Sequence, residues 1–270
     1  MSGARDLAAL LARFPKTRPS LPPKLAAIYT QYYLANRGGE TPASSLSQRL
    51  EGWLHRQVAA DVKGAMDPGA TLELGAGTLN QMAYEPSGGA YDIIEPFQAL
   101  FADSRWLGGV RDAFADIRDV PVGRTYQRIT SIASLEHICD LPFVLARAAR
   151  LLAPGGTLRA AIPSEGGLLW KLGWMATTGL EFRVRHGFDY GLLMAHEHVN
   201  DAREIEILVR ALFEEVEVKS FGLGRQLSLY RFLAARKPRL DVAADWEARF
   251  IGAQPAAGAL RRGQGGSTAA

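Results

Sequence analysis

Apolar residues return every three or four positions in two segments near the start of the chain. One segment follows Pro22 and runs to Gly38, and the other begins at Ser45 or Ser47 and runs to Gly64. Proline suits the first turn of a helix, and glycine suits the position after its last turn. The spacing and these end signals therefore predict two helices.

After residue 66 the pattern changes to short apolar runs separated by longer segments. Strands that alternate with helices indicate a parallel sheet, because a parallel crossover needs a connection long enough to return. We predict strands at 71–75, 90–95, 110–115, 128–133 and 157–163. We predict helices after the glycine-rich turn at 75–77, at 96–107 and at 141–152.

The last part of the chain has a different pattern. Two strand-like runs, 215–221 and 226–235, are separated by a short glycine-containing segment, which indicates an antiparallel hairpin added to the parallel sheet. After Pro238 the residues become rich in alanine, glycine and glutamine, and we expect disorder from about Ala253. The predicted organisation is an N-terminal helical cap (1–66), a main domain (67–237) and a C-terminal tail (238–270).

Composition narrows the class of protein. The chain has 270 residues, of which 47% are hydrophobic and 22% are charged, as in ordinary globular proteins. No apolar run approaches the roughly 20 residues of a membrane-spanning helix, and the first residues do not resemble a secretory signal. A single cysteine, Cys139, favours a reducing, cytoplasmic setting. The net charge of +3 is spread over scattered arginines, so we expect no nucleic-acid partner.

The segment Thr71-Leu-Glu-Leu-Gly-Ala-Gly-Thr78 carries the most information about chemistry. It reads as a buried strand that enters a glycine-rich turn, where the absence of a Cβ lets the backbone bend and approach a ligand. A tight turn without a ligand is the alternative interpretation. Glu95 ends the next predicted strand about 20 residues later, at the spacing where a carboxylate meets a ribose diol. Asn80 replaces the third glycine of a dinucleotide fingerprint, which argues against a nicotinamide cofactor.

With four further segments, the chain resembles the class I S-adenosylmethionine-dependent methyltransferases, of the bacterial type that modifies small molecules or glycans. The matching segments are Glu73–Thr78, 92–95, 115–117, Ser134-Leu-Glu-His137 and Leu151-Leu-Ala-Pro-Gly-Gly-Thr-Leu158. The resemblance implies a Rossmann-like seven-stranded sheet that is mostly parallel and ends in an antiparallel C-terminal hairpin. It also implies S-adenosylmethionine as the cofactor.

The resemblance implies a role for each matching residue. Glu73 would lie near the amino group of the methionine part, and Glu95 would hold the ribose. The loop of Gly75, Ala76 and Gly77 would pass beneath the cofactor. Asp116 and Ile117 would flank the adenine, and Ser134 and Leu135 would line the floor of the site near the methionine part.

Candidate catalytic residues follow the fifth strand, where acceptor sites of this family form. His196 and His198 are the first candidates for a general base, and Glu165 is the next. Capping or core histidines are the alternative. The two histidines with Glu197 also suggest a metal, but no third or fourth converging ligand is evident, so we expect none. His137 is a further candidate base, although the family segment in which it lies favours a positioning role.

The segment 168–175 is strongly apolar and is interpreted as a lid over the acceptor, or alternatively as a contact with a membrane surface. Taken together, the patterns predict an enzyme that methylates a polar small-molecule or sugar-containing acceptor at oxygen. A nicotinamide-dependent oxidoreductase of the same fold is one alternative, and a non-catalytic binding protein is the other. Oligomeric state cannot be inferred from the sequence.

Overall fold

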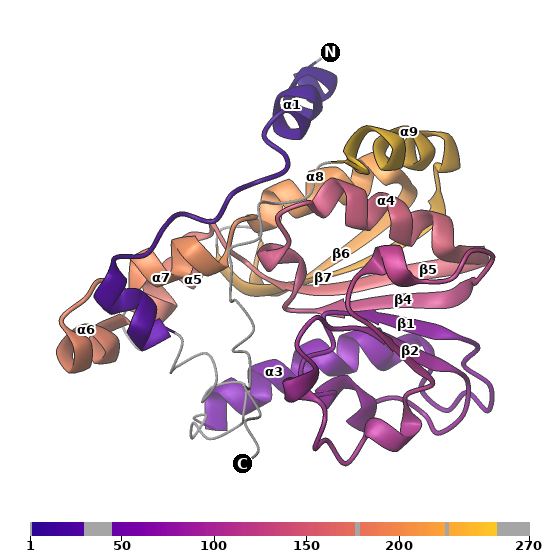
Figure 1. Ribbon diagram of the computed structural model, residues 1–270, viewed down its shortest axis with the longest axis horizontal. Coiled ribbons are helices and arrows are strands. Elements are labelled where there is room, and N and C mark those ends of the chain that lie inside the picture. The colour runs from indigo at the N-terminus through magenta and orange to yellow at the C-terminus, as the bar shows by residue number, and fades with distance from the viewer. Residues whose placement is uncertain (1, 30–44, 176–178, 225–226, 253–270) are drawn as a thin grey trace, which may run out of the picture.

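A single seven-stranded sheet forms the centre of the molecule (Figure 1). The computed structural model describes residues 2–29, 45–175, 179–224 and 227–252. The strand order is β3-β2-β1-β4-β5-β7-β6, which confirms the predicted fold class. The strands are β1 (Thr71–Leu74), β2 (Tyr91–Ile94), β3 (Asp112–Phe114), β4 (Tyr126–Ile132), β5 (Leu152–Pro163), β6 (Phe213–Leu223) and β7 (Leu227–Pro238).

The sheet is parallel from β3 to β5 and antiparallel at its C-terminal edge. β1 pairs in parallel with both β2 and β4, while β7 pairs antiparallel with β5 and with β6. The chain moves outward from β1 through β2 to β3 and then returns to the other side of β1 as β4. In open α/β sheets, ligands bind outside the carboxyl ends of the strands where the order reverses in this way.

Helices cover both faces of the sheet (Figure 1). One face packs against α4 (Leu141–Leu151), α8 (Ala202–Leu212) and α9 (Leu240–Phe250), which share the main hydrophobic core with β1, β4 and β5. The other face packs against α3 (Ser45–Val58), whose Leu54 and Val58 contact Ala161 and Phe232. Both layers shield apolar strand residues from water, which is the main driving force for this arrangement.

The described residues among the first 66 pack in three places, against the main core, against the far face of the sheet as α3, and against Phe182 and Leu193. The main core includes Leu10 and Leu11 of α1 (Ser2–Leu11). Residues 23–29 are helical, and their Leu25 packs against Phe182 and Leu193 on the opposite side of the molecule. The continuation of this predicted helix towards Gly38 lies outside the described residues.

Two predicted helices are wrong. Residues 96–107 form turns and a short 3-10 segment, η3 (Gln98–Leu100), and the turn at 75–77 leads only into η2 (Asn80–Ala83). Leu79 adopts a left-handed backbone (φ 67°) and lies in a small apolar cluster with Phe101, which fixes these connections through packing. Tertiary contacts here override the weak local preference for helix.

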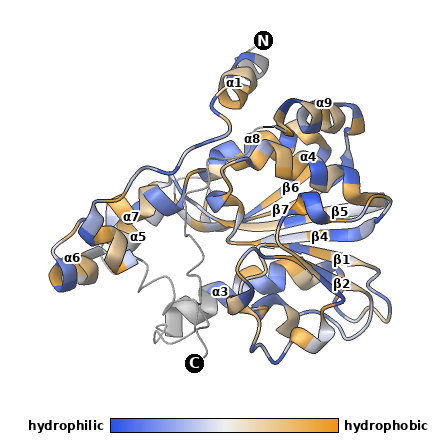
Figure 2. Cartoon of the chain, in the orientation of Figure 1, coloured by the Kyte–Doolittle hydropathy of each residue, from blue (hydrophilic) through white to orange (hydrophobic). Residues whose placement is uncertain are grey.

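The connection between β5 and α8 forms a separate helical unit that extends sideways from the sheet (Figure 1). It contains α5 (Leu168–Trp174), α6 (Leu180–His186) and α7 (Tyr190–Glu197). Figure 2 shows apolar stretches on α5 and α7. The remaining short 3-10 segments are η1 (Ala59–Asp61), η4 (Leu107–Gly109), η5 (Ile117–Asp119) and η6 (Leu135–His137).

The residues that follow Pro238 do not begin a loose tail. They form α9, whose Trp246 and Phe250 are buried in the main core against α4. The segment 253–270, where we expect disorder, lies outside the described residues.

Candidate methyl-transfer site

The loops that follow β1, β2 and β3 lie next to one another at the carboxyl edge of the sheet. The backbone N–H groups of Gly75 and Ala76 donate to the carbonyl of Ile94 (2.8 and 3.3 Å), and the N–H of Glu95 donates to the carbonyl of Phe114 (2.9 Å). The parallel registers of these three strands bring their ends to the same level. The structure thus brings the glycine turn and the acidic end of β2 together.

The glycine turn needs glycine at position 75 for two reasons. Gly75 has a φ of +70°, and a Cβ built there would lie 2.0 Å from the Oγ of Ser134. Gly77 also has a positive φ (+52°), but no atom lies within 4 Å of the position of its Cβ. The turn therefore packs on the loop after β4 at Gly75 and leaves open space over Gly77.

Glu95 lies directly after β2 with its carboxylate turned back to the glycine turn. Oε2 accepts from the N–H of Gly77 (2.9 Å), and Oε1 accepts from the N–H of Phe97 (3.0 Å). The residue is only 4% exposed. A carboxylate has about four lone-pair sites, so the two backbone donors leave capacity for two vicinal hydroxyls. This donor and acceptor set fits the ribose of S-adenosylmethionine.

Asp116 and Ile117 follow β3 at the same edge. Asp116 is the N-cap of η5, where its Oδ1 accepts from the N–H of Arg118 (2.8 Å), and its side chain remains 46% exposed. Ile117 is buried in the main core. The guanidinium of Arg118 also donates to both carboxylate oxygens of Asp116 (3.1 and 3.0 Å), so a contact of Asp116 and Ile117 with an adenine stays a prediction. Ser134 and Leu135, after β4, complete this row of residues, with Leu135 fully buried.

Glu73 lies within β1 rather than at the edge. It is buried and accepts a hydrogen bond from the hydroxyl of Tyr91 (2.9 Å). The pKa of Glu73 is raised to about 8, mainly by burial and in smaller part by the neighbouring Glu85 and Glu95, against the hydrogen bond from Tyr91. Because Tyr91 is itself buried, this carboxylate is directed into the protein interior.

A second polar cluster surrounds His198, just after α7. The Nδ1 of His198 lies 2.9 Å from Oε2 of Glu165, and the indole N–H of Trp170 donates to the same oxygen. The ring of Trp170 is stacked near His198 (centroids 6.5 Å apart), and Tyr230 of β7 meets Trp170 edge-on. The structure thus joins two of the three predicted catalytic residues, Glu165 and His198.

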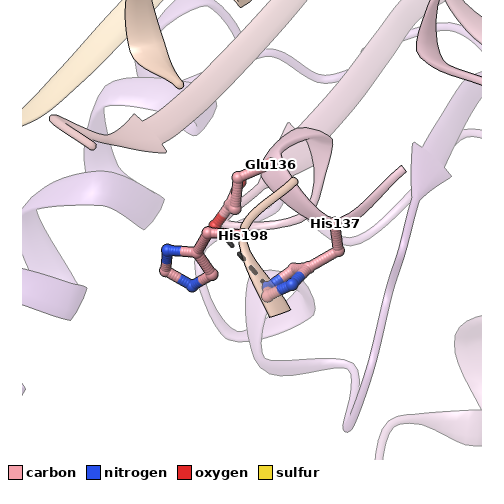
Figure 3. Close-up of side chains that lie close together, drawn as sticks. All are labelled: Glu136, His137 and His198. Carbon is pink, nitrogen blue, oxygen red and sulfur yellow. Dashed lines mark ion pairs between the residues drawn. The ribbon is translucent and has the colours of Figure 1, made fainter. Parts of the chain in front are cut away.

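Glu136 and His137 come to the same cluster from the loop after β4 (Figure 3). Nε2 of His137 lies 3.8 Å from Oε1 of Glu136. The other ring nitrogen of His137, Nδ1, lies 2.9 Å from the carbonyl oxygen of Glu197. Glu136 is only 2% exposed, and its Oε2 has no hydrogen-bond partner among the described residues. Candidate ligand atoms of Glu136, His137 and His198 lie within 4.8 Å of one another.

The cluster holds protons more tightly than isolated groups would. Burial raises the pKa of Glu136 to about 7. Burial alone would lower the pKa of His198, but the hydrogen bond that its ring donates to Glu165 and the nearby carboxylates raise it above its ordinary value. Burial also raises the pKa of Glu197, against the positive charge of Arg18. Carboxylates outnumber cations in this cluster around His198, and an excess of negative charge favours a positive charge on the His198 ring.

The structure does not bring His196 into this cluster. Its Nδ1 lies 2.7 Å from the carbonyl oxygen of Pro19, and its ring meets Tyr29 edge-on at 5.3 Å. Helix α7 carries His196 to the side that faces the N-terminal segment, whereas His198 follows the end of the helix. The two histidines therefore have different surroundings, although they are separated by one residue.

Residues that the sequence did not single out hold the cluster in place. The guanidinium of Arg18 donates to the carbonyl oxygens of His196 (2.8 Å), Glu197 (3.1 Å) and His137 (2.8 Å). The side chain of Asn200 donates to the carbonyls of Leu135 and Ile138. No local pattern marks Arg18, because its partners lie more than a hundred residues away. The residue after Asn200, Asp201, caps α8 in a capping box with Glu204.

The apolar segment 168–175 lies beside this cluster as α5. Its Trp170 turns towards His198, while Leu168, Leu172 and Met175 are exposed. A contact of this side with a membrane surface stays a prediction. Among the described residues, no helix has the length and apolar character needed to cross a bilayer.

Comparisons with known proteins complete the identification. No family profile matches the chain. It is similar to uncharacterized methyltransferases of Mycobacterium bovis and Mycobacterium tuberculosis, with 28% identity over 145 residues that cover 52% of this chain and 71% of those proteins.

Solved structures also resemble the chain. A possible exported protein from Bordetella parapertussis has a TM-score of 0.51 and 13% identity, with coverage of 87% of this chain and 97% of that one. The N-methyltransferase NodS from Bradyrhizobium japonicum, in complex with S-adenosyl-L-homocysteine, has a TM-score of 0.48 and 14% identity, with coverage of 73% and 89%.

These similarities agree with the motifs and with the sheet. The Bordetella protein supports the fold, and the mycobacterial relatives carry the name of methyltransferase. The strand order with an antiparallel final pair is the one that the family resemblance implied. The chain is thus similar in sequence to proteins named methyltransferase, and it has the fold that the resemblance to class I S-adenosylmethionine-dependent methyltransferases implies.

Proposed function

We propose that the chain transfers a methyl group to an oxygen of a polar small-molecule or sugar-containing acceptor. The observation that carries this proposal is the loop of residues 134–137 after β4. At one end, Ser134 packs on the glycine turn. At the other, Glu136 and His137 join the cluster around His198 and Glu165. A methyl donor held at the glycine turn would lie next to a set of proton-accepting groups.

Each end of this arrangement has its own task. S-adenosylmethionine, when bound, supplies a methyl group that is already activated on a sulfonium. Glu95 and Asp116 orient the adenosine part, and Gly77 leaves room for the ligand to approach the backbone. The chain must then hold the acceptor oxygen in line with the carbon–sulfur bond, and positioning of this kind accounts for roughly 7–11 kcal/mol of a barrier.

Glu165 is the residue best placed to take the proton of an acceptor hydroxyl. His198 and Trp170 both contact its Oε2, which fixes the carboxylate. Within the described part of the chain no protein group bonds its Oε1, and the side chain is partly exposed. As the oxygen–carbon bond forms and the carbon–sulfur pair returns to sulfur, the hydroxyl proton would pass to Oε1 of Glu165.

His198 then acts as a positioning residue through Nδ1, and His196 has no part in the transfer. Neutralising the base should lower turnover much more than removing either remote histidine. We expect Glu165→Gln to lower kcat by about 10²–10⁴-fold, the range for loss of a general base, with little change in the affinity for S-adenosyl-L-homocysteine.

The experiment uses labelled S-adenosylmethionine and a panel of acceptors with hydroxyl groups, including simple phenols and nucleotide sugars, with amines for comparison. His186→Ala, in α6, is the control variant, and His196→Ala tests the rejected histidine. Methylation of amines but of no hydroxyl would contradict oxygen as the acceptor atom. Full turnover by Glu165→Gln would contradict the role of this carboxylate.

Calorimetry separates the remaining alternatives. A methyltransferase should bind S-adenosyl-L-homocysteine and show no affinity for NADH, whereas an oxidoreductase of the same fold would show the reverse. A non-catalytic binding protein would bind S-adenosyl-L-homocysteine but transfer no methyl group to any acceptor of the panel.

A further inference from the structure

The cluster of Glu136, His137 and His198 contains more ligating atoms than proton transfer needs. Two imidazoles and one carboxylate approach one another from two loops, the first after β4 and the second after α7 (Figure 3). Their candidate ligand atoms lie within 4.8 Å of one another. Small side-chain rotations would bring all three to the distance of about 2.1 Å that divalent transition metals take from nitrogen and oxygen.

Each imidazole is oriented by a hydrogen-bond partner on its other side. Nδ1 of His198 faces Oε2 of Glu165 at 2.9 Å, and Nδ1 of His137 faces the carbonyl oxygen of Glu197 at 2.9 Å. Histidines that ligate metals commonly donate their second ring N–H to a carboxylate or to a backbone carbonyl, which directs Nε2 to the ion. Both arrangements occur here in one cluster.

The carboxylate of the cluster is buried without compensation. Glu136 is 2% exposed, and its Oε2 has no hydrogen-bond partner among the described residues. Burying a carboxylate oxygen without a partner costs free energy, so such groups are normally paired or bound to a metal. The nearest cationic candidate is the His137 ring, 3.8 Å from Oε1, and Arg18 is directed at backbone carbonyls instead.

We propose that Glu136, His137 and His198 bind one divalent transition-metal ion. Two imidazoles and a carboxylate suit ions such as Zn²⁺, Fe²⁺, Co²⁺ or Mn²⁺ better than Mg²⁺ or Ca²⁺, which prefer oxygen ligands alone. Three protein ligands leave coordination positions for an oxygen of the acceptor.

The role of this ion rests on the proposed oxygen methylation. A divalent ion lowers the pKa of a coordinated hydroxyl, as it does that of a bound water. Because Glu165 is held on the far side of the His198 ring, the proton would pass to its Oε1 through one intervening water. A carboxylate is too weak a base to deprotonate a free hydroxyl efficiently. Binding of the hydroxyl to the ion lowers the pKa of the hydroxyl, so that a carboxylate can accept its proton.

Metal binding can be measured without any acceptor. The full chain is treated with a chelator and titrated with Co²⁺, followed by calorimetry and by the visible absorption of the bound ion. We expect one Co²⁺ per chain with a Kd below about 10 µM. Glu136→Gln and His198→Gln should each weaken binding by at least about 10-fold, and Glu165→Gln, which removes the partner of a ligand, by about 10–100-fold.

His186→Gln is the matched control, because it changes a histidine of α6 outside the cluster and should bind Co²⁺ as the native chain does. Circular dichroism and affinity for S-adenosyl-L-homocysteine verify that each variant is folded. Absence of Co²⁺ binding by the native chain would overturn the proposal. So would unchanged binding by folded Glu136→Gln and His198→Gln variants, since the ion would then be bound elsewhere.

The two proposals can fail separately. Co²⁺ binding that depends on Glu136 and His198, with no methylation of any hydroxyl, would refute oxygen methylation and support the metal site. Full methylation of a hydroxyl acceptor by the chelator-treated chain, with no Co²⁺ binding, would support the proposed function and refute the metal site.

Discussion

Gly75 and Ser134 come from loops after two neighbouring strands and pack directly on each other. The close approach exists because position 75 has no Cβ, and its φ of +70° is unfavourable for any other residue. The same pair links the expected cofactor loop to the cluster of Glu136 and His137. Two physical effects, steric overlap and backbone strain, are therefore combined at one residue and can be separated by mutation.

We expect Gly75→Ala to destabilise the chain by about 2–5 kcal/mol, because a left-handed backbone costs about 1–2 kcal/mol and an overpacked contact adds about 1–3 kcal/mol. Urea unfolding measures the change. The double variant Gly75→Ala, Ser134→Gly should recover the steric part, since it removes the Oγ and Cβ of Ser134 and leaves its Cα, which lies 4.0 Å away.

Gly77→Ala is the matched comparison for this prediction. Its φ is also positive, but open space surrounds the position of its Cβ, so only the strain of about 1–2 kcal/mol should appear. If Gly75→Ala and Gly77→Ala cost the same, and Ser134→Gly rescues nothing, the packing of the two loops is not what requires glycine at position 75.

Single residues of the site could be predicted only where a local motif marks them. The glycine turn and Glu95 are found because strand, turn and acid follow at fixed spacing along the chain. Glu165 and His198 could be named as candidates, but not as partners, since 33 residues separate them. The three residues proposed here as metal ligands could not be recognised as a set, because the sequence places His198 next to Glu197 and His196, whereas the fold places it next to Glu136 and His137.

At the scale of elements, strands were easier to predict than connections. Buried strands are short continuous apolar runs. The five parallel strands and the two antiparallel strands all overlap their predicted ranges. Residues 96–107 have a composition that favours a helix. In the structure their Phe101 and Trp106 pack in one cluster with Leu79, and a chain of turns allows this packing. The helix α9 was assigned to a tail because its role depends on burial of Trp246 and Phe250, which local composition does not reveal.

The segment from Arg13 to Arg18 is the element whose function depends most on distant contacts. We expect Arg18→Met to lower kcat by about 10–100-fold, because the carbonyls of His137, Glu197 and His196 lose a shared cationic donor and the catalytic groups shift. The affinity for S-adenosyl-L-homocysteine should change little, since the glycine turn and Glu95 do not contact Arg18. Steady-state kinetics and calorimetry give both quantities.

Arg13→Met provides the control within the same segment. Arg13 is paired with Glu204 and its side chain is 61% exposed, so its removal should cost at most about 1 kcal/mol of stability and leave kcat unchanged. Equal losses of kcat in both variants would indicate that the segment matters only for folding and that Arg18 positions nothing.

At the scale of the whole molecule, the face of the sheet under α3 contains an unusual number of charged groups. Arg128 is buried between Asp61 and Glu85, and Arg159 donates to backbone carbonyls at the end of α3. Glu73 lies on the same face without a cationic hydrogen-bond partner, and only the Tyr91 hydroxyl bonds it. The charge of this one carboxylate should therefore oppose folding of the entire domain.

The pH dependence of stability tests this reasoning. Burial raises the pKa of Glu73 to about 8, so the folded chain binds a proton that the unfolded chain releases near pH 4.5. Stability contributed by the neutral carboxyl is fully present below the lower value and is lost as the pH rises to about 8. Glu73→Gln keeps the shape and the acceptor for Tyr91 but cannot ionise. We therefore expect this variant to match the native chain near pH 4.5 and to exceed its free energy of unfolding by a few kcal/mol above about pH 8.

Urea unfolding of both chains across this range measures the difference directly, and Glu217→Gln, an exposed change on β6, controls for the general effect of removing a negative charge. The control should follow the native curve, because it leaves Glu73 in place. A constant difference between Glu73→Gln and the native chain at every pH would mean that Glu73 remains ionised in the fold. A cation must then compensate its charge, and the interior of β1 would be polar enough for Glu73 to take part in cofactor binding as the resemblance implies.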